Sequence, residues 1–217
     1  MPTVFAPGCA LWIHDPDLAR ATFEILRHRI PDLEVHTICC RHDPNRPAGT
    51  RVVNLCPGCD RRYRERYDGI STVSLWEILA EDRAFSFPDY GGRRMAIHDA
   101  CPTRDRSRVQ AAIRALLRRM NVDLVEPEHT RDRSRCCGDS LYGTLPPAGV
   151  RERMTKRASE MPTEEVVVYC VSCIKAMHNG GKRPRYLLDL LFGKPTPPGT
   201  SDPDRWHAQL DAFIAHH

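Results

Sequence analysis

The sequence contains no long hydrophobic run and no features of a secretion signal. No apolar stretch approaches the ~20 residues that a helix needs to cross a bilayer. The first residues, MPTVFAPGCALWIHDPD, lack a basic segment and are interrupted by proline, glycine and acids, unlike a signal peptide. We therefore expect a cytoplasmic protein with no direct membrane insertion, in a compartment where structural disulfides are rare.

Lysine is scarce, so the positive charge of the chain is nearly all arginine. Arginine-rich stretches such as RRYRERY at 61–67 and RDRSR at 104–108 and 131–135 raise the question of nucleic-acid binding. Acids interrupt each stretch, and 28 Asp and Glu reduce the net charge to +4. We expect solvated helix faces and a local site for an anion, and no nucleic-acid partner.

The ten cysteines are too sparse for a secreted disulfide scaffold and numerous for a cytoplasmic protein without a metal. They form two sets of five in the same order: a single cysteine, an adjacent pair, and a C-x-x-C motif. No cysteine is left over, so the pattern is an internal repeat. The first set is Cys9, Cys39, Cys40, Cys56 and Cys59, and the second is Cys101, Cys136, Cys137, Cys170 and Cys173.

The segments around the cysteines predict an α/β fold. Apolar or β-branched runs such as RVVNL and EEVVVY precede the cysteines and read as buried strands. Helical patterns follow: Asp15-Pro16 starts a helix to about Ile30, an apolar stripe covers 109–120, another covers 150–161, and SLWE at 74–77 is a capping box. This alternation predicts two tandem, similar lobes, each with a small, mostly parallel sheet flanked by helices.

Turn residues in FPDYGG at 87–92 separate the two repeats. We predict a first cysteine-rich module at 1–88, a second at 89–193, and a C-terminal loop and helix at 194–217 that pack on the core. Within these, PRYLLDLLFG reads as a short helix that stops at Gly193, and the last helix starts at Asp202-Pro203.

Parallel strands place their carboxyl ends at one sheet edge, so we expect metal sites there. A C-x-x-C at a helix N-terminus has a lowered thiol pKa and suits metal binding. Adjacent cysteines in a strand point to opposite faces unless the chain turns, and Gly138 can supply that turn. Zinc sites and cubane clusters are bound by four protein ligands, and each set offers five thiolates. Either one cysteine of each set binds no metal, or the centre takes more than four sulfurs. The count favours a larger iron–sulfur centre.

The segment Cys101–Cys173, C-x34-CCG-x31-C-x-x-C, resembles the cysteine-rich CCG domain found in the B-type component of heterodisulfide reductase. That component carries two such modules in tandem, so the resemblance extends to nearly the whole chain. It implies a non-cubane [4Fe–4S] cluster on the five cysteines of each module, two in all. In the family this cluster binds and reductively cleaves a disulfide at its open irons.

The first module departs from the pattern, because Arg41 stands where the second has Gly138 and the gap to its C-x-x-C is short. Whether it holds a full, a different or no cluster stays open here. The chain also lacks the C-x2-C-x2-C-x3-C-P run of a cubane relay. As an oxidoreductase acting on a small disulfide or thiol, it would take electrons from an iron–sulfur or flavin subunit or from ferredoxin.

His98, three residues before Cys101, is the candidate catalytic residue, because it could hydrogen-bond a cluster sulfur or protonate a leaving thiolate. Arg41, Arg104 and Arg135 flank cysteines and suit a negative cluster or an anionic substrate. Three alternatives remain: a non-catalytic electron-transfer subunit, a zinc-bound structural protein, and a thioredoxin-like dithiol at CPGC.

Overall fold

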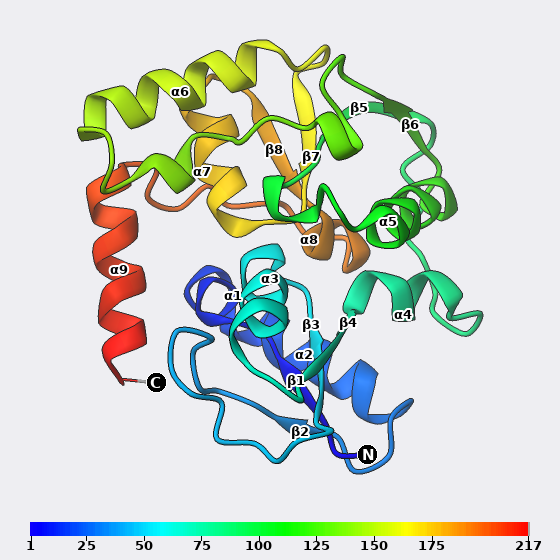
Figure 1. The fold of residues 1–217 in the computed structure, drawn as a ribbon. Helices are drawn as coiled ribbons and strands as arrows, with labels where there is room; N and C mark the ends of the chain where they lie inside the picture. The colour runs from blue at the N-terminus through cyan, green and yellow to red at the C-terminus, as the bar shows by residue number, and fades with distance from the viewer. Residues whose placement is uncertain (217) are drawn as a thin grey trace.

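The chain folds into two α/β lobes, each built on a four-stranded parallel sheet (Figure 1). A computed structural model describes residues 1–216. Both sheets have the same strand order, β2-β1-β3-β4 and β6-β5-β7-β8, which confirms the predicted fold class. The strands are β1 (Thr3–Ala6), β2 (Glu34–Val35), β3 (Arg51–Asn54), β4 (Ser71–Ser74), β5 (Arg93–His98), β6 (Val122–Val125), β7 (Glu165–Val168) and β8 (Arg183–Tyr186).

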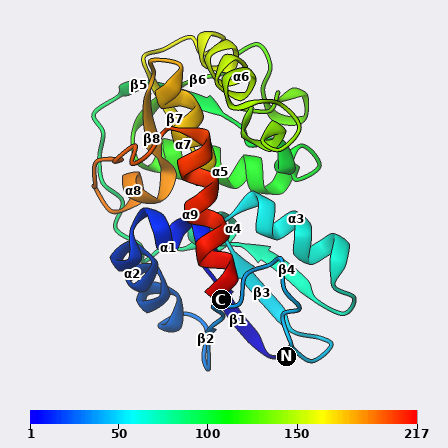
Figure 2. The same cartoon turned by 90° about the vertical axis from the view of Figure 1, so that its left-hand side faces the viewer.

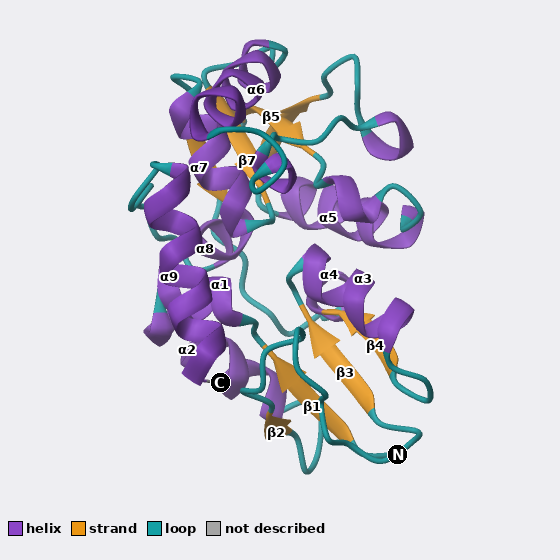
Figure 3. Ribbon diagram, turned by 60° about the vertical axis from the view of Figure 1, so that its left-hand side comes forward, coloured by secondary structure: helices purple, strands orange, loops and turns teal. Residues whose placement is uncertain are grey.

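Helices flank both sheets, as the secondary-structure colouring of Figure 3 shows. The first lobe contains α1 (Cys9–His14), α2 (Pro16–Arg27), α3 (Pro57–Arg66) and α4 (Leu75–Glu81). The second contains α5 (Ser107–Arg119), α6 (Pro147–Ser159), α7 (Val171–Asn179) and α8 (Leu187–Leu191), with short 3-10 turns at Cys101–Thr103, Arg131–Arg133 and Asp139–Leu141. The last helix is α9 (Pro203–His216).

Local sequence signals explain most helix starts. The Asp15 side chain accepts a hydrogen bond from the Leu18 amide at 2.9 Å and caps α2, and Ser74 forms the expected capping box with Glu77. The predicted helix over PRYLLDLLFG was wrong at its start. Residues Arg183–Tyr186 pair in parallel with β7 instead, so the helix is confined to α8.

The two lobes share one apolar core, because Phe5 and Val53 of the first sheet belong to the same buried cluster as Ile97 and Val167 of the second. A cross-lobe hydrogen bond joins His14 Nε2 to the Asp189 carboxyl group at 3.1 Å, with both side chains almost completely buried. Helix α9 runs alongside both lobes (Figure 2). Within residues 1–216, no helix is both long enough and apolar enough to span a membrane.

Candidate metal centre

The parallel topology brings the cysteines of each set to one sheet edge. In the first lobe, the single cysteine follows β1, the adjacent pair follows β2, and the C-x-x-C follows β3. In the second lobe, they follow β5, β6 and β7 in the same way. Because parallel strands end at the same edge, these three loops are neighbours. All ten cysteines are free thiols, and all ten line one cavity of about 480 Å³ that both lobes enclose.

The thiols of each set contact one another in the same sequence. In the first set, side-chain interactions run from Cys9 to Cys39, Cys40, Cys59 and Cys56. In the second set, they run from Cys101 to Cys136, Cys137, Cys173 and Cys170. The first set therefore reproduces the arrangement of the second, although its pair lacks the glycine.

Crowding separates the pKa values of these thiols. Hydrogen bonds from neighbouring thiols lower the pKa of Cys136, and the Gly138 amide and Ser140 hydroxyl also contact its sulfur at 3.3 and 2.9 Å. Its hydrogen bond to Cys136 and its burial raise the pKa of Cys101. Five adjacent thiols cannot all ionise without a compensating cation, and metal ions would supply that charge. The donor set therefore fits a metal centre that takes several sulfurs.

The C-x-x-C motifs lie at helix N-termini, as expected. Cys56 is the N-cap of α3 and Cys170 is the N-cap of α7. The hydrogen bond from Cys59, together with the backbone amides of Cys59 and Gly58, lowers the pKa of Cys56 to about 7 against the opposing effect of burial. A lowered pKa favours the thiolate, which is the form that binds a metal.

Gly138 turns the chain after the second cysteine pair. Its φ is +111°, in the left-handed region, and a Cβ there would lie only 2.9 Å from the Met154 amide nitrogen of α6. Glycine thus meets two requirements at once: the backbone conformation and the close approach of α6. The turn aligns Cys136 and Cys137 with the rest of the second set.

Arg41 does not have to adopt the conformation of Gly138, because it is not among the residues with positive φ. The first pair is held in a turn that the His42 amide closes by donating to the Cys39 carbonyl at 2.9 Å. The Arg41 side chain reaches Asp211 of α9 at 3.4 Å. The substitution at this position therefore reflects a different turn, which still brings the five sulfurs together.

His98 lies beneath the second set rather than in the cavity. It is the last residue of β5, is completely buried, and is not among the residues that line the cavity. A ring nitrogen of His98 and the sulfurs of Cys137 and Cys173 lie within 4.8 Å of one another. Burial and the nearby Arg157 guanidinium lower the pKa of His98 to about 3.

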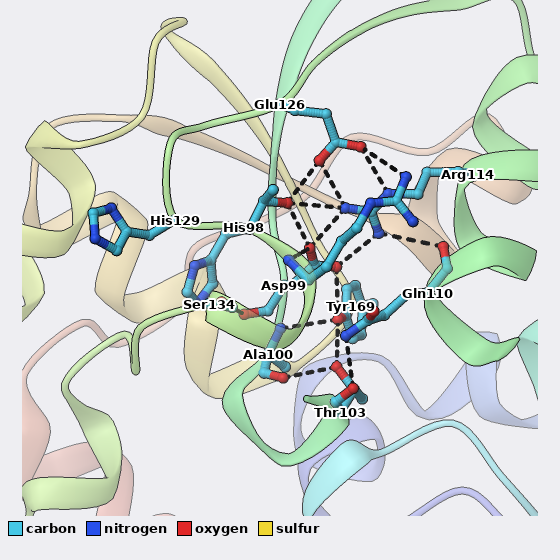
Figure 4. A network of polar contacts seen from close by, with 12 residues as sticks. His98, Asp99, Ala100, Thr103, Gln110, Arg114, Glu126, His129, Ser134 and Tyr169 are labelled. Carbon is cyan, nitrogen blue, oxygen red and sulfur yellow. Dashed lines mark hydrogen bonds and ion pairs between the residues drawn. The ribbon is translucent and has the colours of Figure 1, made fainter. Parts of the chain in front are cut away.

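A buried polar network beside His98 fixes the loops that carry Cys101 and Cys136 (Figure 4). The Asp99 carboxylate accepts hydrogen bonds from Arg114 at 2.8 and 2.7 Å and from the Tyr169 hydroxyl at 3.0 Å. The Ser134 hydroxyl donates to the Asp99 carbonyl at 2.5 Å. These bonds fix Asp99, two residues before Cys101, and Ser134, two residues before Cys136, and so position both loops.

The cavity is also lined by arginines of the RRYRERY stretch, which the sequence did not assign to the cysteine site. Of the three flanking arginines, Arg41 lines the cavity, whereas Arg104 binds the Ser134 carbonyl and Arg135 pairs with Glu160. Positions 58, 61, 62, 65 and 66 of α3 line it as well, which is one face of a helix. The helical spacing of RRYRER after the C-x-x-C motif could have revealed this face.

Helix α9 covers the cavity beside both cysteine pairs. His207 lines the cavity, stacks on Tyr142 with ring centroids 3.7 Å apart, and lies 3.2 Å from Asp139, which follows the second pair. At the other end, the Ile214 carbonyl accepts a hydrogen bond from His42, which follows the first pair, at 2.9 Å. One helix thus contacts the segments after both pairs.

Comparison with known families identifies the second half of this site. Residues 95–178 match the CCG cysteine-rich domain. The match contains all five cysteines of the second set, from Cys101 to Cys173, and supports the CCG family. The CCG match and the clustered sulfurs together indicate an iron–sulfur or other metal-binding protein. A search of curated proteins finds no match to the chain.

Proposed function

We propose that this protein is an iron–sulfur redox subunit that reduces a small disulfide, or forms one from two thiols, within the cavity between its lobes. The observation that carries this proposal is that both five-cysteine sets line the same cavity. Two separate structural metal sites would have no need to face a common space. A shared cavity instead allows one molecule to meet both sets at once.

The residues fit two non-cubane [4Fe–4S] centres, one on each set. Five sulfurs joined by successive contacts exceed the four ligands of zinc, and the order of the contacts is the same in both lobes. A further sign of fit is Gly8, where a Cβ would lie 3.2 Å from the Cys59 sulfur, so a glycine keeps this approach open. When bound, such centres supply one-electron chemistry and open iron sites for sulfur.

The protein's own residues bind and orient the substrate in this proposal. Arg61, Arg62 and Arg66 line the cavity, and their side chains form no ion pair or hydrogen bond with other residues of 1–216, while Glu65 is the acid between them. Their charge favours a disulfide that carries carboxylate, sulfonate or phosphate groups. Reduction of that disulfide to two thiols takes two electrons and two protons, and an iron–sulfur or flavin partner, or ferredoxin, would supply the electrons.

Metal analysis tests the assignment of the centres. Anaerobically prepared wild type should contain about eight irons with matching acid-labile sulfide. Cys137→Ser and Cys40→Ser should each lose about half of the iron and one EPR signal, whereas Ile214→Val, which alters the same cavity without removing a sulfur, should keep both. A colourless protein that contains zinc, or full iron and unchanged spectra in both serine variants, would contradict the proposal.

Turnover separates an enzyme from an electron-transfer module. The iron-loaded protein, supplied with a reduced viologen dye, should oxidise the dye in proportion to added dithiodipropionate, and Cys137→Ser should abolish this reaction. Reduction of both centres by the dye without any turnover would favour the non-catalytic alternative.

A further inference from the structure

The two cysteine sets differ in the residue that lies three positions before the single cysteine. His98 lies three positions before Cys101, and Ala6 lies three positions before Cys9, at the corresponding end of β1. The next residues are Asp99 and Pro7, so the buried polar network of the second lobe has no counterpart at this point of the first. The first set therefore has no histidine at the position that corresponds to His98.

The contact with Arg157 determines which ring nitrogen of His98 carries the proton. The Arg157 Nε–H donates to His98 Nδ1 at 3.2 Å. A guanidinium has no acceptor, so Nδ1 must be the unprotonated nitrogen, and the proton of the ring is on Nε2. Arg157 is itself held in place, because it is buried and also binds Glu160 at 2.5 Å and the His129 carbonyl at 2.7 Å.

The Nε2 atom of His98 is buried and has no hydrogen-bond partner among the described residues. A buried N–H without an acceptor is costly, so an acceptor is expected beside it. A ring nitrogen of His98 lies within 4.8 Å of the sulfurs of Cys137 and Cys173, and because Nδ1 faces Arg157, these sulfurs are the candidate acceptors for Nε2–H. In the chain from 1 to 216, no other histidine places a ring nitrogen at this distance from two cysteine sulfurs.

We propose that His98 Nε2–H donates a hydrogen bond to a sulfur of Cys137 or Cys173, and that this makes the second centre easier to reduce than the first. A hydrogen bond to a ligand sulfur stabilises the more negative, reduced state and raises the reduction potential. Ala6 offers no donor, so the first centre lacks this stabilisation. His98 is thus a positioning residue that acts through the ligands, and electrons entering the protein settle first on the second centre. This inference rests on the proposed function.

Two substitutions separate the hydrogen bond from the packing of the ring. In His98→Asn, the amide stands near the position of Nδ1 and keeps a partner for Arg157, but it loses the donor at Nε2. In His98→Gln, the longer side chain places an amide N–H near Nε2 and should restore the donor. The control is His36→Asn, at the other buried histidine with an unpartnered Nε2, which packs against Tyr63 in the first lobe.

The measurement is an EPR-monitored redox titration of the anaerobic full-length protein, with iron and sulfide quantified in every sample. His98→Asn should lower the reduction potential of the second centre by about 59 mV, which is a tenfold change in the equilibrium constant for a one-electron reduction. His98→Gln should recover part of the shift, and His36→Asn should leave this centre unchanged. Cys40→Ser, which retains the second centre, identifies its signal.

An iron-replete His98→Asn protein with an unchanged potential would overturn the role of His98 and leave the proposed function intact. If neither His98 variant retains iron, ENDOR on wild type labelled with 15N-histidine decides: a histidine nitrogen coupled to the second centre supports the inference, and its absence overturns it. A wild type without iron and sulfide instead overturns the proposed function.

Discussion

At the scale of single residues, the two cysteine pairs show that one arrangement of five thiols is reached by two different backbone conformations. The second pair depends on the left-handed conformation of Gly138 and on the close approach of α6. The first pair uses a hydrogen-bonded turn in which Arg41 needs no positive φ. The second lobe therefore requires glycine after its pair because α6 packs closely against that position. A five-cysteine set does not require glycine there in general.

This difference predicts the effect of Gly138→Ala. The added Cβ meets backbone 2.9 Å away at a positive φ, so the free energy of unfolding should fall by about 1–3 kcal/mol and iron should be lost from the second set. Gly143→Ala is the matched control, because Gly143 has φ +81° but no atom within 4 Å of its Cβ position. Denaturant unfolding and iron analysis of both variants provide the comparison; equal behaviour of the two would contradict the role of the α6 contact.

At the scale of elements, the corresponding helices α3 and α7 differ in the side chains that they expose to the cavity. Arg61 and Arg62 of α3 correspond to Lys175 and Ala176 of α7, counted from the two C-x-x-C motifs. The α7 residues are buried, and Lys175 binds the Pro198 carbonyl, whereas the α3 residues line the cavity. The basic wall, formed by Arg61, Arg62 and Arg66, is therefore a property of the first lobe alone.

The basic wall predicts a charge preference among substrates. Arg62→Gln combined with Arg66→Gln should raise KM roughly tenfold for dithiodipropionate, a loss of about 1.4 kcal/mol, while KM for the cationic disulfide cystamine should stay the same or fall. The effect on the anionic substrate should shrink as salt is added. Arg83→Gln combined with Arg94→Gln, two exposed arginines outside the cavity, is the control. An equal change for both substrates would show that the wall does not recognise charge.

At the scale of the whole molecule, the two lobes form one structural unit. They share an apolar core, the His14–Asp189 pair is buried between them, and α9 contacts the segments after both cysteine pairs. Since the cavity is enclosed by both lobes, a change in their relative position would alter the distance between the two sets.

Calorimetry of the full chain should therefore show a single cooperative unfolding transition. His14→Ala should lower its free energy of unfolding by about 1–3 kcal/mol, because the buried Asp189 carboxyl group loses its hydrogen-bond partner. Lys194→Met, which breaks the more exposed cross-lobe pair with Asp15 at 2.8 Å, should cost about 1 kcal/mol or less. Two resolved transitions, or equal losses in the two variants, would show that the lobes are energetically independent.

The sequence alone determined the repeat, the fold class and the convergence of each cysteine set. These features follow from local patterns: β-branched runs before the cysteines, amphipathic stripes after them, and parallel strands that end at one edge. It also identified Gly138, because a pair of adjacent cysteines needs a turn. It failed at β8, where pairing with β7 overrides the predicted helix that starts at Pro184.

The tertiary structure alone decided that both sets share one cavity, that α3 supplies the basic wall, and that His98 lies behind the second cysteine set. Each depends on contacts between residues far apart in the chain. The proton position on His98, for example, is fixed by Arg157, 59 residues away. Such contacts depend on how the lobes and helices pack, and the periodicity of a single segment carries no information about them.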